Sequence, residues 1–218
     1  MLNTATLRIS RNTILLITIC LSLILSPVNV RALGNDPVLP DFWEFIKSVQ
    51  NNQANILRGV YVPNVLAFPV VQQPAGKAGY VSLLDGEITQ FSMPSQFGNV
   101  GLLAHNNLAG RFFSQLAAGQ EVRLVYGDGH VEYFVIVQIS KFQALDPTSP
   151  YSTFRDLANA ERLTAEQLFN KVYRGDHHVT FQTCIEANGE ASWGRLFVIA
   201  MPKPLYSQNE RLLWQMPR

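Results

Sequence analysis

The sequence predicts an all-β domain, a closed barrel or a sandwich, with only a few short helices. Two observations support this. From Gly59 onward, short apolar or alternating runs are separated by residues typical of turns. Neither internal repeats nor low-complexity segments interrupt this pattern. The strands are expected at residues 60–65, 70–71, 80–84, 88–91, 100–105, 121–126, 131–139, 179–184 and 195–201.

Residues 1–32 are expected to be a signal peptide or a membrane anchor. Arg8 and Arg11 precede an apolar run over residues 14–25, which ends at Ser26-Pro27. This pattern is typical of a secretory leader, because a membrane-spanning helix needs roughly 20 apolar residues. We therefore expect an exported protein, at the cell surface, membrane-associated or secreted.

Without this leader the chain has 14 basic and 16 acidic residues, and Cys184 is its single cysteine. The balance of charge does not suggest a nucleic-acid partner, which would require a basic patch. An unpaired cysteine in an oxidising compartment is buried and inert, paired between chains, or a working thiol.

A linker and one short helix are expected over residues 33–58. Asp41 can cap a helix from Phe42, with Glu44 placed to complete a capping box. The barrel or sandwich is expected over residues 59–203, with Asp85-Gly86 as a hairpin turn. Residues 204–218 form a proline-broken C-terminal tail.

Two further short helices are expected within the β-rich region. One covers residues 108–116, directly after the strand that carries His105. The other begins at Thr164, with Gln167 three residues later in a capping-box pattern. Both are expected to lie on the periphery of the domain.

A strand–loop–strand unit near the C-terminus carries the candidate chemistry. Cys184 ends the first strand, and Arg195 begins the second strand eleven positions later. Asn188-Gly189 lies between them and favours a tight turn. This unit is expected to bring the thiol close to the guanidinium. A thiol beside a fixed cation ionises more easily, and the thiolate is the nucleophile.

Among the four histidines, His105 is the expected partner of the thiol. His130 lies in a predicted hairpin turn, where a solvated surface role is the usual one. His177 and His178 precede the cysteine by a whole strand, roughly 20 Å at 3.3 Å per residue. His105 ends an apolar run and is followed by Asn106.

These residues resemble two signatures of the sortase family. The first lies around the histidine and reads Leu102-Leu103-Ala104-His105-Asn106, followed by Gly110, Phe113, Leu116 and Gly119. The second reads Thr180-Phe181-Gln182-Thr183-Cys184, followed by Arg195-Leu196-Phe197-Val198-Ile199-Ala200. The resemblance covers roughly residues 59–203 and departs mildly at Phe181, where the family usually has leucine.

The resemblance implies a closed eight-stranded β-barrel and a cysteine transpeptidase. Cys184 would attack a C-terminal sorting motif of exported proteins, Leu-Pro-x-Thr-Gly-like, between Thr and Gly. An amine from a cell-wall peptide or a pilin lysine would then resolve the thioacyl intermediate. His105 would act as general acid and base, and Arg195 would stabilise the oxyanion or the substrate.

The resemblance also makes Thr183, Ala104 and Asn106 candidates for binding the substrate, and residues 142–176 the wall of its groove. The side chain of Thr183, however, is expected to face away from that of Cys184. No cofactor and no metal are expected, because the chain lacks a dense acidic cluster and the Cys/His spacing of a zinc site. The pattern assigns neither the sortase class nor the particular motif.

Two alternatives remain open at this stage. L,D-transpeptidases also use a histidine, a cysteine and an arginine, but usually in a Ser-x-Gly-Cys-x-Arg context, whereas Cys184 here follows Thr183 and precedes Ile185. The other alternative is a non-catalytic β-barrel that binds peptides. The reactivity of the Cys184 thiol distinguishes this alternative from an enzyme.

Overall fold

The computed structural model describes residues 39–204. The predicted leader or anchor at residues 1–32 and nearly all of the predicted tail at residues 204–218 lie outside this part of the chain. Within residues 39–204, no helix has both the length and the apolar character needed to cross a membrane.

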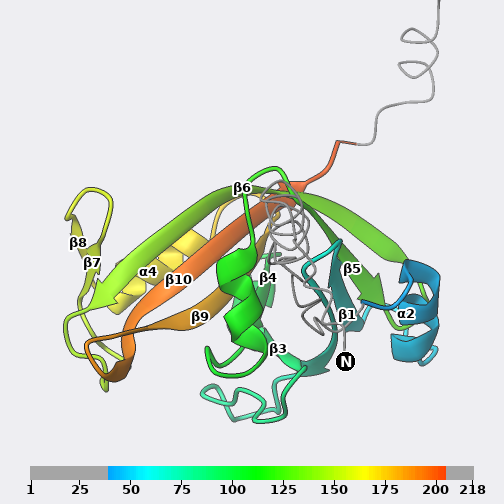
Figure 1. The fold of residues 1–218 in the computed structure, drawn as a ribbon, viewed down its shortest axis with the longest axis horizontal. Coiled ribbons are helices and arrows are strands. Elements are labelled where there is room, and N and C mark those ends of the chain that lie inside the picture. The colour runs from blue at the N-terminus through cyan, green and yellow to red at the C-terminus, as the bar shows by residue number, and fades with distance from the viewer. Residues whose placement is uncertain (1–38, 205–218) are drawn as a thin grey trace, which may run out of the picture. The chain divides into compact units, whose positions relative to one another are not determined.

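Eight strands form a closed barrel in the order β10-β9-β4-β3-β2-β1-β5-β6. Figure 1 shows the long strands β6 and β10 running side by side. Long strand β6 pairs back onto β10 and closes the barrel. The pairs β2–β3 and β4–β9 are parallel, and the others are antiparallel. The bounds are β1 Leu57–Val62, β2 Leu66–Gln72, β3 Ile88–Phe91, β4 Val100–Leu103, β5 Glu121–Tyr126, β6 Val131–Ala144, β9 Val179–Ala187 and β10 Glu190–Pro202.

This architecture confirms the predicted closed eight-stranded barrel with a few short helices. The helices are α2 (Phe42–Val49), α3 (Ser92–Ser95), the 3-10 helix η1 (Ala109–Gln115) and α4 (Ala165–Tyr173). Two short strands, β7 (Phe154–Asp156) and β8 (Arg162–Leu163), extend the sheet beyond β6.

The inside of the barrel is a single apolar core to which all eight strands contribute. Helix η1 also contributes Phe113, whose ring packs edge-on against that of Phe181 on β9, with 5.1 Å between the centroids. Burying such side chains is the main source of stability for a small barrel.

A second apolar cluster lies outside the barrel, between α4 and the outer faces of β6 and β10. Tyr173 of α4 packs against Phe197 of β10, and Phe197 against Phe142 of β6. The two faces of β10 therefore belong to different cores.

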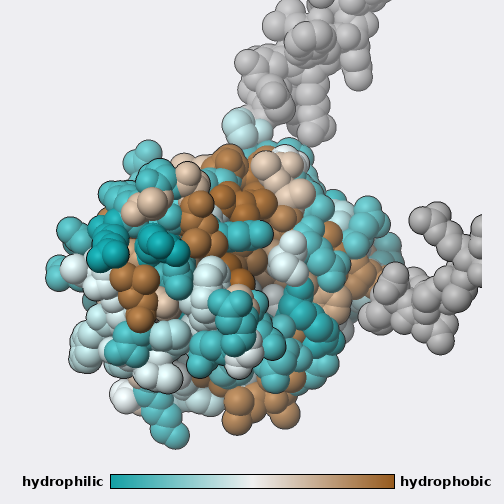
Figure 2. Space-filling model, turned by 60° about the vertical axis from the view of Figure 1, so that its left-hand side comes forward, coloured by the Kyte–Doolittle hydropathy of each residue, from teal (hydrophilic) through white to brown (hydrophobic). Residues whose placement is uncertain are grey.

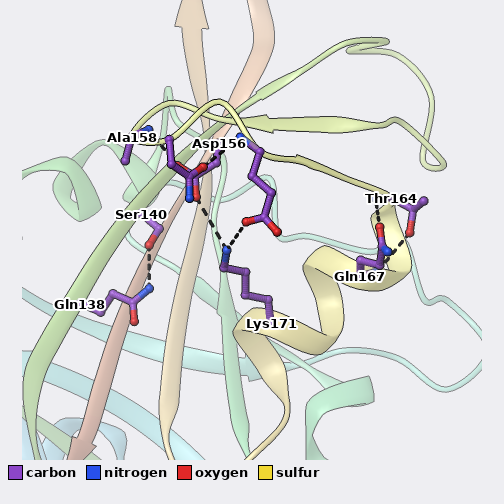
Figure 3. A network of polar contacts seen from close by, with 9 residues as sticks. Gln138, Ser140, Asp156, Ala158, Thr164, Gln167 and Lys171 are labelled. Carbon is purple, nitrogen blue, oxygen red and sulfur yellow. Dashed lines mark hydrogen bonds and ion pairs between the residues drawn. The ribbon is translucent and has the colours of Figure 1, made fainter.

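Polar contacts fix α4 in this position (Figure 3). Thr164 and Gln167 form the predicted capping box at its N-terminus. In its last turn, Lys171 Nζ lies 3.0 Å from a Glu161 carboxylate oxygen and 3.8 Å from Asp156 Oδ2. These contacts join α4 to β7 and to the turn after it.

Several predicted elements differ from those observed. Residues 80–84 do not form a strand, so the predicted hairpin at Asp85-Gly86 is wrong. Ser82 is buried here, and its backbone N–H donates to the Thr89 side-chain Oγ1 on β3 instead of to a backbone carbonyl. Residues 63–65 form the turn between β1 and β2, and were wrongly included in one strand.

Helix α2 begins after Asp41 as predicted, and the Asp41 side chain accepts a hydrogen bond from Trp43 N. Glu44, expected to complete a capping box, instead pairs with Lys47. The predicted helix after His105 is present as η1, and β6 runs five residues further than expected.

Candidate active site

Strand β9 presents consecutive residues to opposite faces of the barrel wall. Thr183 lies opposite Leu196 of β10, and both are buried. Cys184 lies opposite Arg195, and both are half-buried. Residues directly opposite each other in an antiparallel pair project from the same face, with Cβ atoms about 4.5–5.5 Å apart. The thiol and the guanidinium thus share the outer face.

The parallel strand β4 brings His105 to the same end of β9. Leu103 is in register with Gln182, and the Ala104 N–H donates to the Gln182 carbonyl at 3.3 Å. Along the chain after β4, His105 is one residue past Ala104. Along β9, Cys184 is two residues past Gln182. The β9–β10 hairpin and the sequence-distant end of β4 therefore place the three predicted catalytic residues at one end of adjacent strands.

The backbone around His105 is fixed from the inner side. Thr183 Oγ1 donates to the Ala104 carbonyl at 2.8 Å. The His105 carbonyl accepts from the N–H groups of Leu108 and Gly110, both at 3.0 Å. Thr183 and Ala104, predicted to bind the substrate, are both buried, and this hydrogen bond joins β9 to the end of β4.

Gly110 permits this arrangement because it has no side chain. A Cβ at this position would lie 2.3 Å from Thr183 Oγ1 and 2.6 Å from the His105 carbonyl oxygen. Real Cβ atoms do not approach so closely, so η1 can only pack here with glycine. Gly110 appeared in the sequence motif, but its packing role was not predicted.

Backbone carbonyls of β10 hold the Arg195 guanidinium. Its Nη1 donates to the carbonyls of Ser192 and Gly194, at 2.8 and 2.9 Å. Among the described residues, Nε and Nη2 have no hydrogen-bond partner, and neither atom is buried. Arg195 can therefore donate to a ligand while its position is maintained by its own strand.

Asn106 links the loop after His105 to the β9–β10 hairpin, because its Nδ2 donates to the Ala191 carbonyl at 3.1 Å. The hairpin has the predicted tight turn, with positive φ at Asn188 and Gly189. Its strands extend further than expected, up to Ala187 and from Glu190. Asn106 thus couples the segments that carry His105 and Arg195.

An apolar groove with a volume of about 420 Å³ lies on the outer face beside Arg195, a size typical of ligand sites. Its floor includes Gln182 and Phe197, and α4 forms one wall. The predicted groove wall at residues 142–176 supplies much of the lining, including Pro150, Phe154 and Phe169. Figure 2, in which the β7–β8 end comes forward, shows a band of apolar surface among polar side chains.

Cys184 lines a second hollow of about 310 Å³, together with the polar residues Asn106, Lys141 and Glu186. Because Cys184 directly opposes Arg195, which lines the apolar groove, the two hollows border this pair. One side of the pair is an apolar groove, and the other is a hollow whose lining includes several polar and charged side chains.

One polar pair in the apolar groove was not predicted. The Tyr173 hydroxyl donates to Gln182 Oε1 at 2.6 Å. Burial raises the pKa of Tyr173 far above its usual value, so the phenol keeps its proton and remains a donor. The sequence placed Tyr173 on a helix face and Gln182 on a strand, and neither pattern shows that they meet.

The other histidines lie away from this end of β9. His177 and His178 precede β9, where the rings contact the carbonyls of Gly98 and Val172. His130 stacks on Tyr126 in the β5–β6 turn.

Comparisons with known proteins give solved sortases as structural neighbours. Sortase C1 of GBS Pilus Island 1 is 17% identical, with a TM-score of 0.47 over 69% of this chain and 66% of that chain. Sortase A of Listeria monocytogenes is 12% identical, with a TM-score of 0.44 over 74% of this chain and 99% of that chain. A sortase D5 transpeptidase of Clostridium perfringens is 14% identical, with a TM-score of 0.44 over 74% and 88%.

The chain thus spans slightly less than two thirds of the first of these sortases. No protein-family model and no curated protein sequence matches the chain. By name, these neighbours are sortases C1, A and D5. Because the identities and TM-scores are low, the function proposed below rests on the residues of this chain.

Proposed function

We propose that this protein is a sortase-like cysteine transpeptidase that acts on exported proteins at the cell surface. The observation that carries the proposal is the direct pairing of Cys184 with Arg195 on the outer face of the barrel, with His105 brought to the same strand end. A nucleophile, a proton carrier and a fixed cation beside a groove are the components of acyl transfer.

In the first step, the Cys184 thiolate attacks the carbonyl carbon of a peptide bond. A C–S bond forms, the C–N bond breaks, and His105 gives a proton to the departing amine. Negative charge develops on the carbonyl oxygen during this step. The Nε and Nη2 groups of Arg195, which have no hydrogen-bond partner within residues 39–204, supply donors for that oxygen, as in an oxyanion hole.

In the second step, an amine attacks the thioester. His105 takes the proton from this amine, the C–S bond breaks, and the Cys184 thiolate is regenerated. The donor substrate in this proposal is a C-terminal sorting motif, Leu-Pro-x-Thr-Gly-like, cut between Thr and Gly. The acceptor is an amine of a cell-wall peptide or a pilin lysine.

The two hollows support a division of roles. The acyl half of the substrate stays on the enzyme as the thioester, so we assign it to the apolar groove beside Arg195, which can hold it between the two steps. The departing half must leave to admit the amine, and the hollow lined in part by the charged residues Lys141 and Glu186 suits such exchange.

A transfer assay tests this function. The full chain is incubated with a pool of fluorescent Leu-Pro-Xaa-Thr-Gly peptides, with and without glycine or a lysine-containing peptide, and the products are identified by mass spectrometry. The expected product joins the acyl half to the added amine, and the Cys184→Ala variant makes none. Transfer by that variant would contradict the assignment, and products cut by water alone would indicate a peptidase.

A further inference from the structure

Gln182 is a polar side chain on the floor of an apolar groove. In register, it lies between Leu103 of β4 and Phe197 of β10. It precedes Cys184 by two residues on β9 and so projects from the same outer face. The surrounding groove walls include the aromatic rings of Phe91 and Phe169. A polar amide in apolar surroundings costs free energy unless it forms hydrogen bonds, so its partners need to be identified.

Tyr173 fixes the orientation of this amide. Its ring is buried and packs against those of Phe91, Phe169 and Phe197, so the hydroxyl has one place to point. The hydroxyl has no acceptor among the described residues besides Gln182 Oε1. Since a buried hydroxyl needs an acceptor, the oxygen of the amide faces Tyr173 and Nε2 faces the other way.

Gln182 Nε2 is consequently a donor presented to the groove. Within residues 39–204 it makes no hydrogen bond, and it is not among the buried side-chain atoms that lack a partner. The amide is therefore half satisfied by the protein, with its donor half accessible. An apolar group placed over it would remove water from these N–H groups without replacing the lost hydrogen bonds.

Building on the proposed function, we propose that Gln182 is a specificity-determining residue that donates from Nε2 to a side-chain oxygen of the bound peptide. The preferred substrate carries Asn, Gln, Ser or Thr at the second or third residue before the attacked bond, with apolar residues beside it. This names a class of motif that the resemblance alone did not distinguish.

The position within the substrate follows from strand geometry. Two steps along β9 correspond to about 6.6 Å, close to two residues of an extended peptide. The acyl half of the substrate occupies the groove, so the counted residues precede the attacked bond. In an extended peptide lying over a sheet face, side chains point toward the floor while carbonyls point sideways, so a side-chain oxygen is the group that meets Gln182.

Paired peptides test this proposal. The probes are Leu-Pro-Xaa-Thr-Gly peptides with Asn or its near-isostere Leu at Xaa, the second residue before the Thr–Gly bond, and a second pair in which Asn or Leu replaces the Pro, the third residue before it. Their dissociation constants are measured on the full chain carrying Cys184→Ala, so that binding is separated from chemistry. We expect Asn to be preferred over Leu by about threefold to tenfold at one of these positions, the value of one net hydrogen bond.

Three variants in the same background sharpen the test. Gln182→Met keeps the length of the side chain and removes the donor, so the preference should disappear or reverse. Tyr173→Phe frees the amide to rotate and should weaken the preference. Gln138→Met, on β6 beside Ser140 and outside the groove lining, is the matched control and should retain it (Figure 3).

An equal Asn-to-Leu ratio before and after Gln182→Met would overturn the proposal, as would the absence of binding by every peptide. A merely structural role of Gln182 would lower the melting temperature and leave the ratio unchanged. The proposed function has a separate test, the formation of a thioester on Cys184 in the unsubstituted protein. If peptides bind with a preference that depends on Gln182 but no thioester forms, the specificity role is supported and the transpeptidase is excluded.

Discussion

The inner and outer faces of the β9–β10 ribbon have the same backbone and different tasks. On the inner face, Phe181 and Leu196 belong to the barrel core, and Thr183 makes a buried hydrogen bond to Ala104. On the outer face, Cys184 and Arg195 are half-buried and border two hollows. Stability is concentrated on one face, and the proposed chemistry on the other.

This difference shows why the register of β9 matters. A shift of one residue would exchange the two faces, placing Thr183 outside and Cys184 in the core. The inner contacts of Phe181 and Thr183 therefore determine where the thiol points. Variants on the two faces should separate activity from folding.

The largest expected effect is that of Cys184→Ala on the outer face. Peptide transfer should be lost, because alanine has no thiol and Cys184 is the single cysteine within residues 39–204. The melting temperature should change little, since the half-buried thiol makes no disulfide. Activity and thermal unfolding are measured on the same preparation. Loss of the folded state would contradict the separation of the two faces.

Arg195→Lys should lower the transfer rate by about a hundredfold to a thousandfold, the usual cost of losing an oxyanion donor. A lysine keeps the charge but cannot donate to Ser192 and Gly194 while also donating to a substrate with a planar fork. Steady-state rates at saturating peptide measure this effect. A rate near that of the wild type would show that the guanidinium has no such role.

Gly110→Ala tests the inner support of His105. The added Cβ would collide with Thr183 Oγ1 and the His105 carbonyl, and overpacking of this kind costs about 1–3 kcal/mol. Because η1 or the histidine loop must shift, transfer should also fall by about a hundredfold. Urea unfolding and transfer rates are compared with those of Gly119→Ala, where nothing lies within 4 Å of the added Cβ, although its positive φ adds strain. Equal rates of transfer in the two variants would contradict a role of Gly110 in positioning His105.

Thr183→Val is a smaller change on the same inner face. It keeps the branched shape and leaves the Ala104 carbonyl without its donor, at a cost of about 1–3 kcal/mol. Thr183→Ser retains the hydroxyl and serves as the matched control in denaturant unfolding. If Thr183→Ser and Thr183→Val lowered the free energy of unfolding equally, loss of the hydrogen bond would not be the cause of the destabilisation.

The smallest effect is expected at an exposed ion pair, although its Arg111 also lines the hollow beside Cys184. Arg111 forms a bidentate pair with Asp85, and the hydrogen bond from Arg111 lowers the pKa of this exposed carboxyl. A lowered carboxyl pKa contributes stability at neutral pH that is lost as the pH falls through the folded-state value. Because the pair is exposed, Asp85→Asn should leave the melting temperature at pH 7 almost unchanged. A clear decrease would mean that the pair supports the barrel.

Strong local patterns made much of the fold predictable. The capping box at Thr164, the tight turn at Asn188-Gly189 and the alternation along β9 each depend on nearby residues. The strand prediction for residues 80–84 failed because an apolar run before Asp85-Gly86 resembles the first strand of a hairpin. The contact that overrides this pattern, from Ser82 to Thr89, joins the backbone to a side chain and leaves no periodic signal.

The candidate site shows the same limit. The order of His105, Cys184 and Arg195, together with the motifs around them, was visible in the sequence. The partnership of Tyr173 with Gln182 was not, because it joins the end of α4 to the middle of β9 through tertiary packing. The clash that reserves residue 110 for glycine likewise depends on three segments meeting.

The most direct test of the central claim is the intact mass of the full chain after incubation with the peptide pool. The account predicts an added mass equal to the acyl half of one peptide, located on Cys184 and discharged when an amine is supplied. An unmodified chain whose Cys184 also resists alkylation at neutral pH would contradict it, and the outer face would then bind peptides without reacting with them.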